Sequence, residues 1–145
     1  MNDGELISKV NSSMYHQCQE RGYATAEDVL MDIGYLTKQK YEDWRFGRVP
    51  FLEAVCIANL SKLTLVRRTM RQYAQKNGLK PSVTYYKQWG RKKRGSRTTI
   101  PLRFSKSGNP EIEKQYSTHF VDNGRIQAIK ESKTEPEYTE ESHET

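Results

Sequence analysis

The sequence predicts a mainly α (α+β) chain: a helical bundle of about five to six helices, followed by a small C-terminal β-hairpin element. Three observations favour this fold class. Apolar residues recur at helical spacing through the first 90 residues, and glycines stand where these stretches end. After residue 97, β-branched residues and an Asn-Gly dipeptide indicate strands and a tight turn.

The N-terminal third predicts three helices. Four apolar residues share one face of a first helix over residues 4–21: Ile7, Val10, Met14 and Cys18. Thr25 is a typical N-cap for a second helix, which ends near Gly34. Thr37 caps a third helix that runs to about Phe46.

The middle of the chain predicts two more helices with a short connection. Pro50 suits the first turn of a fourth helix over 50–58, and Ser61 caps a fifth over 62–77. This pattern is compatible with a helix-turn-helix, whose second helix enters the major groove of DNA. The alternative is a bundle helix with a charged outer face. Leu65 lies off the apolar stripe of the fifth helix and favours contact with a protein partner.

The C-terminal half changes character. Residues 80–90 read as a turn and a short helix capped by Ser82, and 98–105 as an edge strand. Asn109-Pro110 starts a short helix, and the Asn-Gly at 123–124 predicts a β-hairpin. The acidic segment 131–145 predicts a disordered tail, so we expect a single domain over 1–130 whose β element begins at about 98.

The charge is concentrated in the middle of the chain. Residues 37–97 carry sixteen Lys or Arg against three Asp or Glu, a net charge of +13. Residues 1–36 carry −4 and residues 98–145 carry −3. A local excess of this size attracts polyanions such as nucleic acid.

Two segments supply the candidate nucleic-acid contacts. The fifth helix carries three arginines on one arc, and the stretch from 87 to 97 is a basic run with two glycines. The predicted contacts are Arg67, Arg68, Arg71, Lys87, Arg91, Lys92, Lys93, Arg94 and Arg97. Clustered cations displace counterions from a phosphate backbone. The alternative interpretation of the basic run is a solvated loop.

Two Tyr-x-x-Trp pairs end at Trp44 and Trp89. Large aromatics at helical spacing usually lie in a core, so we expect both tryptophans there and Arg45 and Arg48 facing outward. Trp89 has a second interpretation, because it follows Lys87 and can stack on an unpaired base.

One further segment is a candidate anion site, formed by Ser105, Lys106, Ser107 and Gly108 before a helix N-terminus. It lacks the P-loop spacing, and an ordinary strand–turn–helix joint is the alternative. An enzyme acting on a phosphorylated ligand would use this segment.

Little else favours catalysis. The three histidines are scattered and no metal-ligand spacing occurs, so we expect no catalytic residues, no metal and no cofactor.

The two cysteines, Cys18 and Cys56, read as free thiols of a reducing compartment. The N-terminal stretch has no apolar region of a signal peptide, and no run is long enough for a membrane span. We therefore expect a cytoplasmic protein.

Two stretches carry a resemblance. The chain around YLTKQKYEDWRFGRVPFLE, together with LRFSKSGNPEIEKQYSTHFV, resembles a group of small uncharacterised bacterial proteins over about residues 34–121. The resemblance implies a bacterial cytosolic source or a mobile element, and it brings no activity and no residue roles.

The leading hypothesis is a non-enzymatic nucleic-acid-binding protein with a regulatory or mobile-element role, with DNA more favoured than RNA. The alternative is a protein–protein interaction module, such as an adaptor, an antitoxin-like partner or a homodimer, with no nucleic-acid role. The acidic tail, which can mimic a polyanion, favours this alternative.

Overall fold

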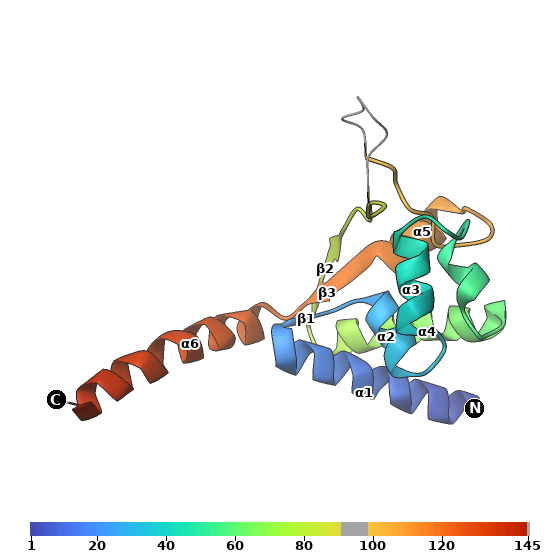
Figure 1. Cartoon of the computed structure of the whole chain (residues 1–145). Coiled ribbons are helices and arrows are strands. Elements are labelled where there is room, and N and C mark those ends of the chain that lie inside the picture. Colours follow the sequence, from blue (N-terminus) through green and yellow to red (C-terminus); the bar gives the residue numbers. More distant parts are fainter. Residues whose placement is uncertain (91–98, 145) are drawn as a thin grey trace.

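Helices dominate the structure, and a small sheet joins segments from both halves of the chain (Figure 1). The computed structural model describes residues 1–90 and 99–144, with side chains up to residue 133. The predicted fold class, mainly α with a small β element, is confirmed.

Two long helices form the base of the molecule. α1 (Asp3–Arg21) packs against α4 (Leu60–Lys76), and each contributes an apolar row to the contact. The residues of these rows are at most 1% exposed: Leu6, Val10 and Met14 from α1, and Leu63, Val66 and Met70 from α4. Full burial of one such side chain stabilises a fold by about 1.5–3 kcal/mol, so this contact is a major part of the core.

Shorter helices cover the other side of the core: α2 (Ala26–Asp32), α3 (Lys38–Arg45), the 3-10 turn η1 (Leu52–Val55) and α5 (Pro110–Ser117). Trp44 of α3 is fully buried, as predicted. Its indole Nε1 donates to the carbonyl of Arg103 at 2.7 Å. Its ring lies 4.8 Å from the ring of Phe104, which stacks on Tyr116. Trp44 thereby ties α3 to the segment before α5.

The sheet has three antiparallel strands in the order β1-β3-β2. They are β1 (Tyr23–Ala24), β2 (Lys80–Val83) and β3 (Thr118–Val121). β3 is central, and it aligns Phe120 with Ala24 on one side and His119 with Ser82 on the other. β2 lies at an edge, where Pro81 has no N–H to offer a further strand.

The predicted helix-turn-helix is wrong at its first helix. Residues 50–58 contain only η1. The amides of Leu52 and Glu53 donate to the carbonyls of Arg103 and Phe104, so this backbone pairs with a distant loop instead of continuing a helix. The predicted fourth helix is therefore a single 3-10 turn that anchors the loop before α5.

The start of the fifth helix also differs from the prediction. α4 begins after Asn59, whose Oδ1 accepts a hydrogen bond from the Lys62 amide at 2.9 Å. Asn59 is thus the N-cap, and Ser61 lies inside the first turn. Asparagine and serine both cap helices well, but it is Asn59 whose backbone has the extended geometry of an N-cap.

The predicted C-terminal hairpin is wrong in its second half. Its first half is β3, and a helix follows in place of the second strand. Asp122 accepts a hydrogen bond from the Arg125 amide at 2.9 Å, so the Asp-Asn-Gly sequence begins α6 (Asn123–Glu144). Asp122 acts as an N-cap and favours a helix at a sequence that could otherwise form a hairpin turn.

The segments 80–90 and 98–105 also differ from expectation. The predicted short helix capped by Ser82 is instead strand β2. Residues 100–102 run beside 86–88 through two hydrogen bonds, Gln88 N to Ile100 O and Leu102 N to Tyr86 O, and no longer strand forms there. The β element is therefore the sheet of β1, β2 and β3, whose strands come from three separated segments of the chain.

α6 points away from the rest of the molecule (Figure 1). Its first turn rests against the end of α1, where Gly22 has a φ of +86°. A Cβ at Gly22 would overlap the side chain of Ile126, so glycine serves both the turn and the close approach. The backbone is helical through 131–144, where composition predicts a disordered tail; the domain boundary at residue 130 stays a prediction.

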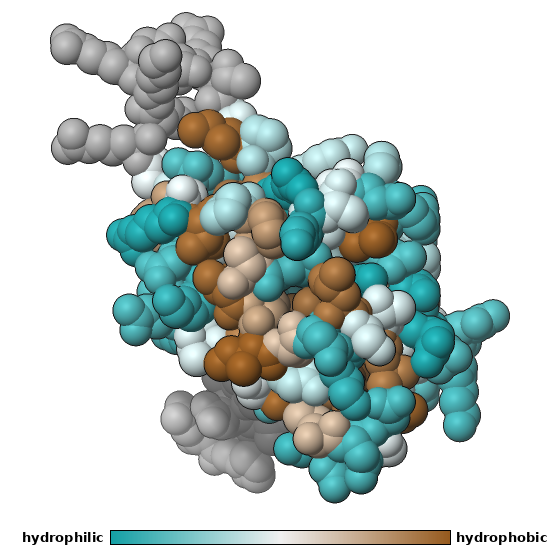
Figure 2. All heavy atoms as spheres, turned by 90° about the vertical axis from the view of Figure 1, so that its right-hand side faces the viewer, coloured by the Kyte–Doolittle hydropathy of each residue, from teal (hydrophilic) through white to brown (hydrophobic). Residues whose placement is uncertain are grey.

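Apolar and hydrophilic groups are interspersed on the face shown in Figure 2. Ile57 and Leu60 are the most exposed large aliphatic residues described, at 71% and 57%. Leu65, in contrast, is only 7% exposed and belongs to the core, so it does not mark a partner surface. Within the described ranges, no helix combines the length and apolar character that crossing a bilayer requires.

Candidate nucleic-acid interface

Arg67, the first of the three arginines predicted on α4, is buried. Its guanidinium lies 3.5 Å from the Glu53 carboxylate, and both side chains are 6% exposed. It donates to the Tyr116 hydroxyl at 2.8 Å and to the side chains of Gln115 and Thr64. The structure therefore places Arg67 in the core, against the prediction that it contacts nucleic acid.

The other two arginines of α4, Arg68 and Arg71, are exposed and stand three positions apart, as neighbours on the surface of the helix. Arg68 is near the start of α1, where its charge acts on Asp3. Arg71 lines a groove of about 600 Å³ together with Lys114. Lys114 also lines the neighbouring groove of about 800 Å³, which contains Lys87. Lys114 thus connects the groove of Arg71 with the groove of Lys87, and Arg68 lines neither groove.

The predicted anion site is filled by the protein's own carboxylates. Glu113 accepts hydrogen bonds from the amides of Phe104 and Ser105, at 2.8 and 2.7 Å, and from the Ser105 hydroxyl. Glu53 accepts from the Lys106 amide at 2.9 Å. Amides that would bind a phosphate are therefore already satisfied.

The rest of this segment is also internally bonded. Gly108 donates its amide to the Ser105 hydroxyl, and the Ser107 hydroxyl accepts from the Asn109 amide. Ser105 itself is 1% exposed. Ser105, Lys106, Ser107 and Gly108 form the joint before α5, which was the alternative interpretation.

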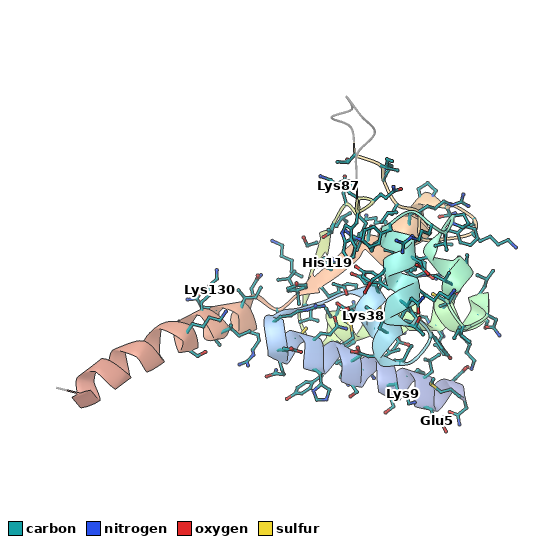
Figure 3. All side chains as sticks on the ribbon, in the orientation of Figure 1. Glu5, Lys9, Lys38, Lys87, His119 and Lys130 are labelled. Carbon is teal, nitrogen blue, oxygen red and sulfur yellow. The ribbon has the colours of Figure 1, made fainter. Side chains whose placement is uncertain are left out.

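The basic run begins beside the end of α3. Five predicted contacts lie outside the described residues: Arg91, Lys92, Lys93, Arg94 and Arg97. The run is preceded by Trp89, whose amide donates to the Arg45 carbonyl at 2.6 Å. Lys87, two residues earlier, is exposed and lies in the upper part of Figure 3, far from Glu5 and Lys9 on α1. The chain thus enters the basic run from a position fixed against α3.

Cations and aromatic rings gather at this position. We call them the aromatic–basic cluster: Arg45, Phe46, Arg48, Lys87 and Trp89. The Arg45 guanidinium carbon lies 4.4 Å from the Trp89 ring centre, and that of Arg48 lies 4.9 Å from the Phe46 ring centre. The two rings are 5.6 Å apart, edge to face, and each residue is 39% exposed. Trp89 therefore lies at the surface, not in the core as one interpretation predicted.

A glycine brings the two segments of the cluster together. α3 ends at Arg45, and Gly47 follows with a φ of +73°. A Cβ at Gly47 would overlap the Gln88 side chain. The left-handed turn and the missing side chain let residues 87–89 pass close to the end of α3.

A small pocket adjoins the cluster. We call it the tyrosine pocket; its volume is about 330 Å³. Four of its lining residues carry rings: Tyr23, Tyr41, Tyr85 and His119. Tyr86 and Glu27 also line it and are buried, so they form its floor. Its charged lining residues include Arg21, Asp28 and Arg45. His119 lies in the middle of the molecule in Figure 3, below Lys87.

The floor of the tyrosine pocket is a three-residue hydrogen-bonded group. The Tyr86 hydroxyl lies 2.7 and 2.8 Å from the two carboxylate oxygens of Glu27, and 2.7 Å from Nε2 of His119. Tyr86 has one proton, which it donates to Glu27, so His119 donates to Tyr86 through an Nε2–H. Burial raises the pKa of Glu27 and of Tyr86, and burial lowers the pKa of His119. The imidazole is therefore favoured in its neutral form.

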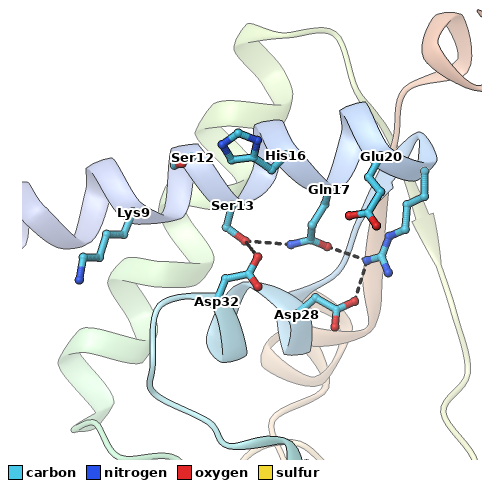
Figure 4. A pocket seen from close by; sticks show the side chains of 9 residues that line it. Lys9, Ser12, Ser13, His16, Gln17, Glu20, Asp28 and Asp32 are labelled. Carbon is cyan, nitrogen blue, oxygen red and sulfur yellow. Dashed lines mark hydrogen bonds and ion pairs between the residues drawn. The ribbon is translucent and has the colours of Figure 1, made fainter.

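A second polar site lies between α1 and α2 (Figure 4). Ser13 donates to Asp32 at 2.6 Å, Gln17 donates to Ser13, and Arg21 donates to Gln17 and to Asp28. These side chains satisfy one another across a groove of about 630 Å³. The network holds α2 against α1, and it occupies these polar groups with one another.

Sequence reasoning did not find the tyrosine pocket. Tyr86 is 59 residues from Glu27 and 33 residues from His119, and the linear pattern left the histidines scattered. Only the pairing of β3 with β2 and the packing of α2 bring the three groups together. Among the described residues, no cluster of three or more His, Cys, Asp or Glu is placed to hold a metal.

No protein-family model, curated protein or solved structure matches this chain. The resemblance drawn from its two characteristic stretches stays a prediction. Residues and geometry alone therefore carry the assignment of a function.

Proposed function

We propose that this chain is a non-enzymatic nucleic-acid-binding protein, with DNA favoured over RNA, in a regulatory or mobile-element setting. It binds phosphate through the aromatic–basic cluster and the adjoining basic run. The observation that carries the proposal is the fixed entry of the run beside Arg45 and Arg48. Trp89 is bonded to the Arg45 carbonyl, Lys87 stands two residues before it, and the next segment of the sequence, 91–97, contributes five Lys or Arg.

Electrostatics supports this location more than any other. A concentration of like charge at one site raises the local potential, and each cation that meets a phosphate releases a condensed counterion. Arg48 does pair with Asp43 at 3.0 Å, but its side chain is 62% exposed and remains accessible. Arg67 does not contribute, because Glu53 neutralises it inside the protein.

The exposed rings add a second kind of contact. Trp89 and Phe46 present aromatic surface beside the cations, and a base can stack on such a ring whatever its identity. The combination of stacking surface and clustered positive charge is typical of proteins that bind nucleic acid without strong sequence preference. We therefore expect affinity to depend more on salt than on sequence.

The test is a salt-titrated binding measurement on a variant in which Arg91, Lys92, Lys93 and Arg94 are replaced by glutamine. Affinity should fall evenly across unrelated sequences. The slope of log K against log salt should flatten by about 0.9 for each lost contact to duplex phosphate, or about 0.7 for single strands.

A matched control neutralises four exposed cations elsewhere on the described surface: Lys9, Arg68, Lys76 and Lys133. Both variants change the net charge equally. If the two variants lose affinity and slope alike, or if neither differs from the natural chain, the basic run is not the binding element.

A further inference from the structure

The tyrosine pocket opens beside the aromatic–basic cluster, and two residues that line the pocket also contact Trp89 of the cluster. Arg45 lines the pocket and places its guanidinium carbon 5.2 Å from the ring centre of Tyr86 and 4.4 Å from that of Trp89. Tyr41 also lines the pocket, and its ring meets that of Trp89 edge to face at 5.9 Å. A ligand bound across Trp89 is therefore adjacent to the pocket.

The rings form a continuous series across this part of the molecule. Beyond Tyr86 follows His119 at 5.8 Å, then Tyr23, stacked on His119 at 5.7 Å. The Arg21 guanidinium carbon lies 4.3 Å from the ring centre of Tyr23 and ends the series. A guanidinium thus lies over an aromatic ring at each end of the pocket, Arg45 at one end and Arg21 at the other.

The interior of the pocket offers hydrogen-bond acceptors. The Glu27 side chain is 5% exposed and accepts the hydrogen bond of the Tyr86 hydroxyl, which leaves further lone pairs on its carboxylate oxygens. Arg45, at the border with the cluster, has a buried Nε with no acceptor among the described residues. The lining therefore suits a flat ring with N–H groups on its edge and a negative charge on one side.

The pocket is small and its mouth is aromatic. Its volume of about 330 Å³ is at the low end of ligand pockets, which span roughly 300–1,000 Å³. Tyr85 borders the pocket and is 86% exposed, so its aromatic ring is in contact with water. A pocket of this volume, bordered by aromatic rings, accommodates one planar ring system.

We propose that the tyrosine pocket takes one unpaired nucleobase of a strand bound at the aromatic–basic cluster. The proposal rests on the proposed function and names its ligand more closely, as single-stranded nucleic acid. A base inside a duplex cannot reach the pocket without being flipped out, which costs a few kcal/mol by unstacking and unpairing. Single strands supply such a base without that cost.

The test is a thermodynamic cycle between one tyrosine and one base. A labelled ten-nucleotide single strand is titrated by fluorescence anisotropy, and then the same strand with an abasic site at each position in turn. Tyr85→Ala should weaken binding at least fivefold, the loss expected for one base–aromatic stack. The most sensitive abasic position should cost a similar factor with the natural chain and almost nothing with Tyr85→Ala.

Two comparisons make the result decisive. Tyr15→Ala removes another exposed tyrosine, from α1, and should leave affinity unchanged. A duplex of the same sequence should bind more weakly than the single strand, and should be insensitive to Tyr85→Ala. Because Tyr85 is so exposed, its variant is expected to unfold at the same temperature as the natural chain.

The outcomes separate the two proposals. Salt-dependent binding without coupling between Tyr85 and any base overturns the pocket assignment and leaves the proposed function standing. Absence of binding to every strand and duplex overturns both. Coupling at one position, absent with Tyr15→Ala, supports the pocket as a base site.

Discussion

At the residue scale, arginines that look alike in the sequence have opposite roles. Arg67 shares a helical arc with two exposed arginines, and spacing alone predicts that all three face outward. Its burial depends on Glu53 and on Tyr116, which lies 49 residues further along the chain. Such partners cannot be read from local periodicity. Trp44 was predictable as core, because a large ring on an amphipathic helix face has few other places to go.

Arg67→Ala tests this assignment. The substitution leaves the Glu53 carboxylate buried without its cation, so the free energy of unfolding should fall by about 3–5 kcal/mol. Denaturant titration measures the change. Arg68→Ala, one residue along and exposed, should change stability by less than about 0.5 kcal/mol. Similar effects of the two substitutions would contradict the buried ion pair.

At the element scale, local capping signals were the most reliable part of the sequence. Thr25, Thr37 and Asn109 accept the hydrogen bonds expected of N-caps, and the helices after them begin where predicted. Two of the errors occur where two local signals compete. Asp122 begins a helix at a sequence that is also a typical hairpin turn, and Asn59 stands two residues before an equally suitable Ser61.

The competition at α4 is directly measurable. Asn59→Ala removes the side-chain oxygen that accepts from the Lys62 amide, and should cost about 0.5–2 kcal/mol of stability. Ser61→Ala should cost less than about 0.5 kcal/mol, because Ser61 lies within the helix. Thermal unfolding of the two variants side by side gives the answer, and a larger loss for Ser61→Ala would restore the cap that the sequence predicted.

At the scale of the whole molecule, the sequence located the charge but not its arrangement. Within the described residues 37–90, folding buries Arg67 against Glu53, leaves Arg68 near the start of α1, and places Arg45 and Arg48 at the end of α3. Only the last includes exposed rings. The tyrosine pocket depends on contacts between α2, α3 and the sheet, so no stretch of the sequence could have indicated it.

The central claim is that the cations at the end of α3, and not the net charge, bind nucleic acid. The most direct measurement compares two double variants that lose the same charge, Arg48→Gln with Lys87→Gln and Arg68→Gln with Lys76→Gln, by salt-titrated binding to one single-stranded probe. The first pair should weaken binding and flatten the salt slope by about 1.4, two contacts of about 0.7 each. The second pair should match the natural chain; equal losses from both pairs would contradict the claim.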